Sequence, residues 1–195
     1  MKMKNLLKNR RNNRTNMCFR EWLTIATHST MTTAIDIKRF SRPKWVGGVK
    51  TPENLNLITM GALIAITHAK TAQDAFYLPC QYILGMTQDQ VNKALAVDVV
   101  SFAGWCAAQM DFINDMFKQL HRDYTPEERQ AGAENLRFGV FGLVDWFAVR
   151  MGIHDHEEVE RMPWIRIYEC MKIDMEREAY QRRLQKIYIN KSKRK

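Results

Sequence analysis

The sequence predicts an all-α protein, a single-domain irregular helical bundle of about six helices with a long central helix and a long C-terminal helix. Apolar residues recur at helical spacing, and helix-start signals alternate with glycine stops along the chain. No alternating apolar and polar run longer than about five residues indicates a strand. We expect a basic N-terminal arm and extended segment at 1–50, whose sequence also allows disorder. A helical domain at 51–190 and a basic tail at 191–195 should follow.

Composition and charge support a globular chain with basic ends. The chain has 195 residues, 46% of them hydrophobic, and a net charge of +9 that lies mainly in the first thirty residues and the last five. Without a continuous apolar run of transmembrane length, no membrane helix is predicted. Four cysteines without a C-x-x-C pair are typical of free thiols in a reducing compartment. We therefore expect a cytoplasmic protein, in the host cell cytoplasm if a phage encodes it.

Residues 1–30 differ in composition from the rest of the chain. The first sixteen are rich in Lys, Arg and Asn, and Met31 is followed by TTAID, a plausible protein beginning. One hypothesis is that translation starts at Met31 and that residues 1–30 are an upstream extension. The other is that they form a genuine disordered basic arm.

The segment from Phe40 to Ala69 begins as a loop and ends as a helix. Pro43 and the Gly47-Gly48 pair indicate an extended arm or loop, in which Trp45 either packs on the body or docks to a partner. The Thr51-Pro52-Glu53 run is typical of a turn or helix start. The apolar spacing that follows predicts a helix over 53–69.

The next two predicted helices include the longest one. Thr71 with Asp74 predicts a helix start, and that helix ends at Gly85. Thr87 and Gln90 form a capping box that is expected to open a helix running to Leu120, since its apolar residues recur every 3.6 residues on average. The wide apolar face includes Trp105, Phe112 and Met116, as expected of a central helix.

The last third of the chain contains four predicted helical segments. Thr125-Pro126 opens a helix to about Arg137, and a short buried helix around Leu143–Val149 ends at Gly152. Gly139 and Gly142 allow a bend or a close helix crossing. Asp155 with Glu158 caps the next turn, and Pro163 starts a helix of over 25 residues with an apolar first half and a charged second half.

No catalytic constellation is apparent. His154 and His156 lie two residues apart, so on a helix they point about 200° apart, unlike an i, i+4 zinc pair; an acidic helix start explains them better. Cys80 or Cys106 with His68 or His121 has no local signature of a nucleophile. No glycine-rich nucleotide motif is present. We expect no enzyme, no metal and no cofactor.

Two kinds of partner site are predicted. The first is a set of apolar anchors for a protein partner; the alternative interpretation is that these side chains form the core. They are Phe141, Trp146, Phe147, Trp164, Met171 and Met175. The second is a nucleic-acid site made of basic residues; the alternative interpretation is that these residues form a solvated helix end. They are Arg182, Arg183, Lys186, Lys191, Lys193, Arg194 and Lys195. A second basic-aromatic run spans Arg39–Trp45. Oligomer formation stays open.

The order of these elements resembles the small α-helical tail assembly chaperones and assembly proteins of tailed bacteriophages. The resemblance spans roughly 52–188 and rests on Asn54-Leu55 before Gly61, the long helix ending at Leu120, Phe138-Gly139, and the run from Val159 to Trp164. Such proteins are thought to coat the tape-measure protein before the tail tube polymerises. The resemblance implies a chain without enzymatic activity whose partner is a helical tape-measure or other tail protein.

Overall fold

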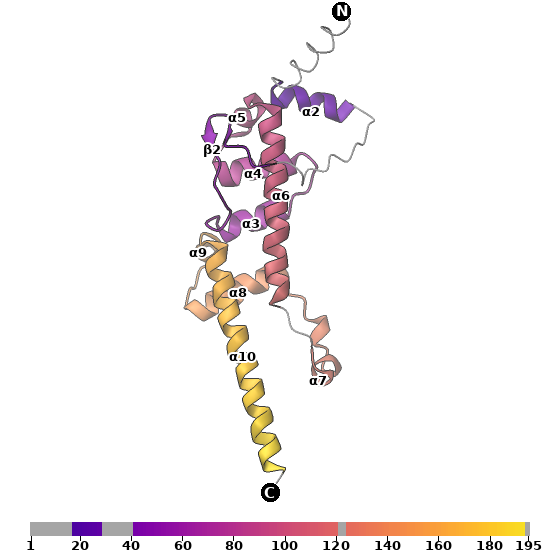
Figure 1. The fold of residues 1–195 in the computed structure, drawn as a ribbon, viewed down its shortest axis with the longest axis vertical. Coiled ribbons are helices and arrows are strands. Elements are labelled where there is room, and N and C mark those ends of the chain that lie inside the picture. The colour runs from indigo at the N-terminus through magenta and orange to yellow at the C-terminus, as the bar shows by residue number, and fades with distance from the viewer. Residues whose placement is uncertain (1–16, 29–40, 121–123, 194–195) are drawn as a thin grey trace, which may run out of the picture. The chain divides into compact units, whose positions relative to one another are not determined.

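The computed structural model describes residues 17–28, 41–120 and 124–193 (Figure 1). Helices dominate these residues, and the strands described among them form one small two-stranded sheet, which confirms the all-α class. The two longest helices, α6 (Ala96–Gln119) and α10 (Trp164–Ser192), correspond to the long central and C-terminal helices that the sequence predicts. Met31 and most of residues 1–30 lie outside the described residues.

The chain divides into two compact units, and the division falls within the range for which we expected one domain. Unit 1 lies within Met1–Leu55 and Ala62–Phe112, and unit 2 comprises Asn56–Gly61 and Ile113–Lys195. Each unit has buried apolar residues of its own. The helical pattern of the sequence is continuous through both units, and so it contains no sign of this division.

Unit 1 contains α2, the small sheet, most of α3, two further short helices and the first two thirds of α6. The bounds are α2 (Phe19–His28), β1 (Trp45–Val46), β2 (Val49–Lys50), α3 (Met60–Thr67), α4 (Asp74–Leu84) and α5 (Gln88–Lys93). Aromatic rings form the centre, where Phe19 lies within 6 Å of both Phe76 and Tyr77 by ring centroid. The predicted stop at Gly85 is confirmed by its left-handed conformation, with φ 65°.

Parts of the predicted arm at 1–50 belong to this core. Phe19 and Val46 are completely buried in the same apolar cluster as Tyr77 and Cys80. Residues 45–50, which we predicted as an extended arm or loop, form a hairpin in which Trp45 pairs with Lys50. Gly47 and Gly48 both have positive φ, as a tight two-residue hairpin turn requires. Alternation was too short to predict these strands, because each has only two residues.

The predicted helix from Val91 to Leu120 is interrupted, which corrects our prediction. The Thr87 capping box is confirmed but opens only α5, since Ala94 is extended with ψ 160°. The Phe19 amide donates to the Ala94 carbonyl at 2.9 Å, and the Ala96 amide donates to the Met17 carbonyl at 3.0 Å. These bonds to a distant segment replace helical ones, and α6 begins at Ala96. Phe112, expected on the apolar face, is 62% exposed.

The predicted helix over 53–69 begins seven residues later than expected. Thr51 is buried, and its hydroxyl donates to the Pro43 carbonyl while Arg42 Nη1 donates to the carbonyls of Thr51 and Pro52 at 3.2 and 3.0 Å. These bonds anchor the Thr51-Pro52 step to the preceding segment. The chain then stays irregular until α3 starts at Met60.

Unit 2 consists of the Asn56–Gly61 segment with the start of α3, the last turns of α6, a short 3-10 helix and four α-helices. The bounds are α7 (Pro126–Gln130), the 3-10 helix (Ala133–Asn135), α8 (Gly139–Met151), α9 (His156–Glu160) and α10. The Thr125 box, the Gly152 stop and the Asp155 cap are confirmed. The helix predicted to reach Arg137 ends at Gln130, because Gly132 adopts a left-handed conformation with φ 82°.

Backbone bonds join the N-terminal ends of α3 and α10. The Met60 amide donates to the Met162 carbonyl at 2.8 Å, and the Trp164 amide donates to the Ile58 carbonyl at 3.2 Å. Beside them, a Cβ on Gly61 would lie only 3.3 Å from both the Cβ and the carbonyl oxygen of Glu160. The absence of a side chain at Gly61 therefore allows this close approach.

By length and composition alone, α6 is apolar enough to cross a membrane, although we predicted no membrane helix. Half of its most apolar window is buried inside the structure. Core helices of water-soluble proteins share these properties, so the feature decides neither for nor against a membrane.

Candidate partner-binding surface

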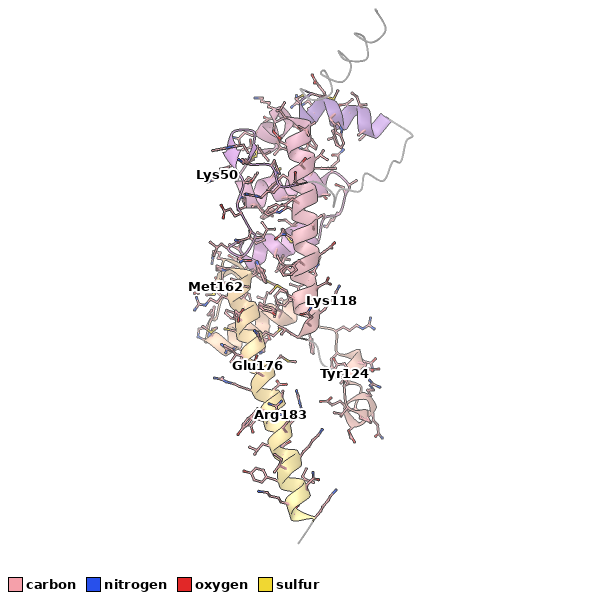
Figure 2. All side chains as sticks on the ribbon, in the orientation of Figure 1. Lys50, Lys118, Tyr124, Met162, Glu176 and Arg183 are labelled. Atoms are coloured by element: carbon pink, nitrogen blue, oxygen red, sulfur yellow. The ribbon has the colours of Figure 1, made fainter. Side chains whose placement is uncertain are left out.

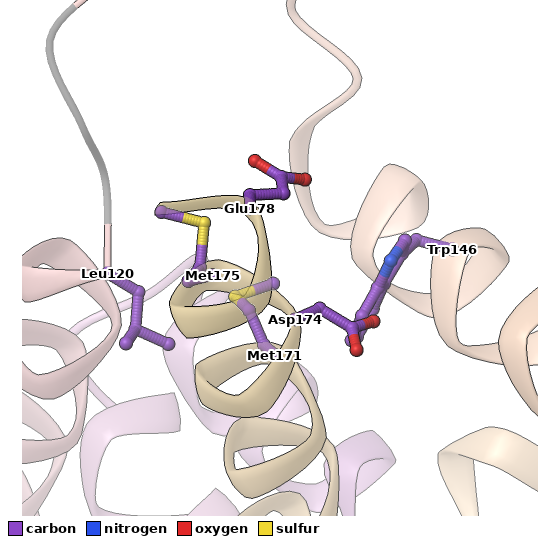
Figure 3. Close-up of a pocket in the computed structure, with 6 residues that line it drawn as sticks. All are labelled: Leu120, Trp146, Met171, Asp174, Met175 and Glu178. Atoms are coloured by element: carbon purple, nitrogen blue, oxygen red, sulfur yellow. The ribbon is translucent and has the colours of Figure 1, made fainter. Parts of the chain in front are cut away.

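A shallow pocket opens on unit 2 between α8, α10 and the residue that follows α6 (Figure 3). Its volume is about 190 Å³, and its lining consists of Leu120, Trp146, Met171, Asp174, Met175 and Glu178. Three of the six predicted partner anchors, Trp146, Met171 and Met175, thus come together here. Pockets for cofactors and drug-sized ligands usually measure about 300 Å³ or more. An apolar cavity of about 150 Å³ holds one benzene ring, so this pocket has room for one side chain.

Helical spacing aligns the two methionines with the buried side of α10. Met171 and Met175 lie four residues apart and follow Ile167 and Tyr168 on one face. Trp164 and Tyr168 pack against Phe117, with ring centroids 5.9 and 5.5 Å apart respectively. The pocket is therefore where the core stripe of α10 reaches solvent. Both methionines are half-buried and have no rigid branch, which suits them to partners of different shape.

Two ion pairs frame the apolar floor of the pocket. Arg150 on α8 donates from Nε to Asp174 Oδ2 at 2.8 Å and from Nη2 to Oδ1 at 3.2 Å, a two-point contact. The side chains are only 24% and 29% exposed. The hydrogen bond that Arg150 donates to Asp174 raises the pKa of Arg150 above its usual value. One turn further on, Arg182 donates to Glu178 at 3.3 Å.

The other three predicted anchors are not in the pocket. Phe147 and Trp164 are 0% and 1% exposed, so they are core residues of unit 2 and are not available to a partner. This corrects their assignment as contact residues. The ring of Phe141 is 65% exposed, and its edge meets the His156 ring at a centroid distance of 5.1 Å. Residue type and spacing alone do not show that Trp146 lines the pocket while Phe147 is buried, because both are aromatic residues of one helix.

The second half of α10 is solvated along its length and carries the predicted basic residues (Figure 2). Arg183, Lys186, Lys191 and Lys193 are exposed, and Arg182 is partly covered. Arg182, Lys186 and Lys193 follow the pocket methionines on the same side of the helix at steps of seven, four and seven residues from Met175. Arg194 and Lys195 lie outside the described residues, as do the first two residues of the Arg39–Trp45 run.

The histidine cluster has local partners in unit 2. The Asp155 side chain accepts from the Glu157 amide at 2.9 Å, which confirms the predicted helix start. His156 Nε2 lies 3.2 Å from Asp145 Oδ1 on α8. Within residues 17–28, 41–120 and 124–193, no group of three or more His, Cys, Asp or Glu side chains is arranged to hold a metal ion.

The buried cysteines are poor candidates for nucleophiles. Burial raises the pKa of Cys80 to about 12 and that of Cys106 further, and the Cys80 thiol adds to the effect on Cys106. A thiol with so high a pKa is almost entirely protonated at neutral pH. His68 Nδ1 lies 2.9 Å from the Ile64 carbonyl in the last turn of α3, and His121 is outside the described residues.

The glycines of α8 act within the helix. Gly139 has φ 59° at the helix start, and a Cβ on Gly142 would clash with the Phe138 Cβ one turn earlier. We predicted a bend or a close helix crossing at these glycines. The contact at Gly142 is instead local, and the close approach between segments occurs at Gly61.

Comparison with protein-family models, with curated proteins and with solved structures finds no match for this chain. The surface is therefore interpreted from its own geometry.

Proposed function

We propose that this protein is a non-catalytic assembly chaperone or adaptor that binds a helical segment of a partner protein. The observation that carries the proposal is the apolar pocket lined by Trp146, Met171 and Met175. It lies where the buried apolar stripe of α10 ends and becomes accessible to solvent. Aromatic and methionine side chains are the residues that protein-binding surfaces favour. The small volume suits one anchoring side chain of a partner.

The charges beside the pocket define the partner further. Beyond Glu178, the basic side chains of Lys186 and Lys193 extend the pocket face of α10 over roughly four more turns, and Ile189 lies between them. A complementary partner is an amphipathic helix with an apolar anchor at one end and carboxylates along the rest. Such binding is reversible and requires no chemical step.

A phage or prophage tail is the proposed setting. The resemblance to tail assembly chaperones supports it, and the partner would then be the tape-measure or another helical tail protein. A partner helix lying on α10 would be shielded from premature association by the contact itself.

Binding measurements on pocket variants test the proposal. The full chain is co-expressed with a candidate partner, a long helical protein from a neighbouring gene, and the complex is captured at low salt. Met175→Lys is expected to weaken binding about tenfold or more, because an ammonium group in the apolar pocket loses hydration. Val149→Lys, on an α8 side chain that is 76% exposed, is the matched control and is expected to bind normally.

The failure of wild-type protein to form any complex would contradict the proposal, as would equal binding by Met175→Lys and wild type. Circular dichroism of both variants checks that the helices remain folded. Trp146 provides a second readout, since partner binding is expected to change its fluorescence emission.

The alternative function is nucleic-acid binding through the basic end of α10. The exposure of Arg183, Lys186, Lys191 and Lys193 favours it. Affinity for a random-sequence duplex should then fall steeply with salt, and replacing Lys191 and Lys193 by Gln should reduce the slope by about two. Salt-independent binding, or none, would reject this alternative.

A further inference from the structure

A second apolar stripe lies on the opposite side of α10 from the pocket. At about 100° per residue, Ile173, Tyr180, Leu184 and Ile187 fall within about 60° of one another and roughly opposite Met171 and Met175. Ile173, Tyr180 and Ile187 are 44%, 55% and 51% exposed. The steps of seven, four and three residues are those of a coiled-coil seam.

The charges of α10 are distributed unequally along its length. From Glu169 to Glu178 the helix carries four carboxylates and two basic side chains, whereas from Arg182 to Lys193 it carries five basic side chains and no acidic one. Glu176 and Arg183 flank the stripe on one side. Neither forms an ion pair with another described residue, in contrast to the Glu178–Arg182 pair on the pocket side.

We propose that two copies of this chain associate through this stripe, with their α10 helices antiparallel. In the antiparallel register centred between Glu178 and Ala179, Ile173 packs against Leu184 of the second copy, and Tyr180 packs against the aliphatic part of Arg177. This register places Glu176 beside Arg183 of the second copy, and it does so twice because the pair is symmetric.

Charge complementarity favours a second copy of this chain as the partner of the stripe, with the two α10 helices antiparallel. A parallel pair would place Arg177 against Arg177 in the seam, where like charges repel. The antiparallel pair instead aligns the acidic half of each helix with the basic half of the other. The proposed function uses the opposite face, so a dimer leaves both pockets open to partners.

Charge-reversal variants of the full chain test the proposal by sedimentation equilibrium. Wild type is expected to dimerise, with a dissociation constant in the micromolar range that a stripe of this length supports. Glu176→Arg alone and Arg183→Glu alone should each weaken dimerisation about tenfold or more, because two attractive pairs become repulsive. The double variant should regain the wild-type affinity.

Mixing the two single variants provides the decisive measurement. In an antiparallel heterodimer each altered charge meets its opposite, so the equimolar mixture should dimerise at a concentration at which neither variant does so alone. Glu178→Arg, on the pocket side, is the control and should dimerise like wild type. A wild-type chain that stays monomeric at roughly 100 μM would overturn the proposal. Dimers unaffected by the single variants, or singles not rescued by mixing, would overturn it equally.

Discussion

Arg150 and Asp174 join α8 to α10 through two parallel hydrogen bonds of 2.8 and 3.2 Å. They lie 24 residues apart in the sequence, at the rim of the pocket that holds Trp146. Both side chains are less than one third exposed, so solvent competes for them less than at the other ion pairs of α10. This pair therefore helps to set the position of one wall of the pocket relative to its floor.

The Arg150–Asp174 pair should show energetic coupling. Arg150→Met leaves the partly buried Asp174 carboxylate without its two hydrogen bonds, and Asp174→Leu leaves the guanidinium in the same situation. We expect the double variant to lose less stability than the sum of the single losses. Urea unfolding of the three variants measures this, and strictly additive losses would show that the pair does not stabilise unit 2.

Two phenylalanines of α8 should respond very differently to truncation. Phe147→Ala is expected to lower the free energy of unfolding by about 3–5 kcal/mol, because it leaves a cavity where the side chain is completely buried. Phe141→Ala, at a side chain 65% exposed, should change it by less than about 0.5 kcal/mol. Chemical denaturation of both proteins tests the assignment of Phe147 to the core, and equal effects would refute it.

The Thr87 capping box should contribute about 1 kcal/mol. Thr87 Oγ1 accepts from the Gln90 amide at 3.3 Å, and Gln90 Oε1 accepts from the Thr87 amide at 2.7 Å. Thr87→Ala removes the first bond and should cost about 1 kcal/mol, whereas Thr87→Ser retains it. Faster hydrogen exchange at the Gln90 amide in the Ala variant alone is the expected local signature.

Stability should depend on the charge of Asp74 in acid. Asp74 Oδ2 accepts from the amides of Thr71 and Lys70 at 2.8 and 3.0 Å, and the bond from Thr71 contributes most to a lowered pKa of Asp74. A lowered pKa in the folded state means that the contribution is complete above the unfolded value, about 4. It is lost as the pH falls through the lowered pKa.

Asp74→Asn provides the measurement, because it keeps the size of the side chain and removes its charge. Thermal unfolding should show a lower Tm for the variant at pH 7, and the difference from wild type should shrink below about pH 4. A difference that is constant over this range would mean that the charge of Asp74 does not contribute.

Cysteine reactivity should divide the four thiols into two pairs. Cys18 and Cys170 are partly exposed, whereas Cys80 and Cys106 are buried and have raised pKa values. A thiol-specific reagent at neutral pH should therefore modify the first pair in native protein and the second pair only after denaturation. Mass spectrometry of the labelled peptides identifies them, and rapid native labelling of Cys106 would contradict its buried position.

Local signals predicted much of the fold and part of the site. The capping boxes at Thr87 and Thr125 and the stop at Gly152 are formed by residues close in sequence, so their geometry follows from local hydrogen bonds. Phe19, Trp22 and Leu23 already have the three- and four-residue spacing of an amphipathic helix, a signal that could have assigned α2 to the core.

The sequence by itself determined the helical class, the helix starts and stops, and the apolar and basic halves of α10, because each depends on residues within a few turns of one another. Only the tertiary structure decided where α6 begins, since the amide of Phe19 bonds to Ala94 from a distant segment. Packing likewise decided that Phe147 is core while Trp146 lines a pocket. Burial depends on neighbours that folding brings together from distant parts of the chain, and the spacing of residues along one helix does not indicate which neighbours these are.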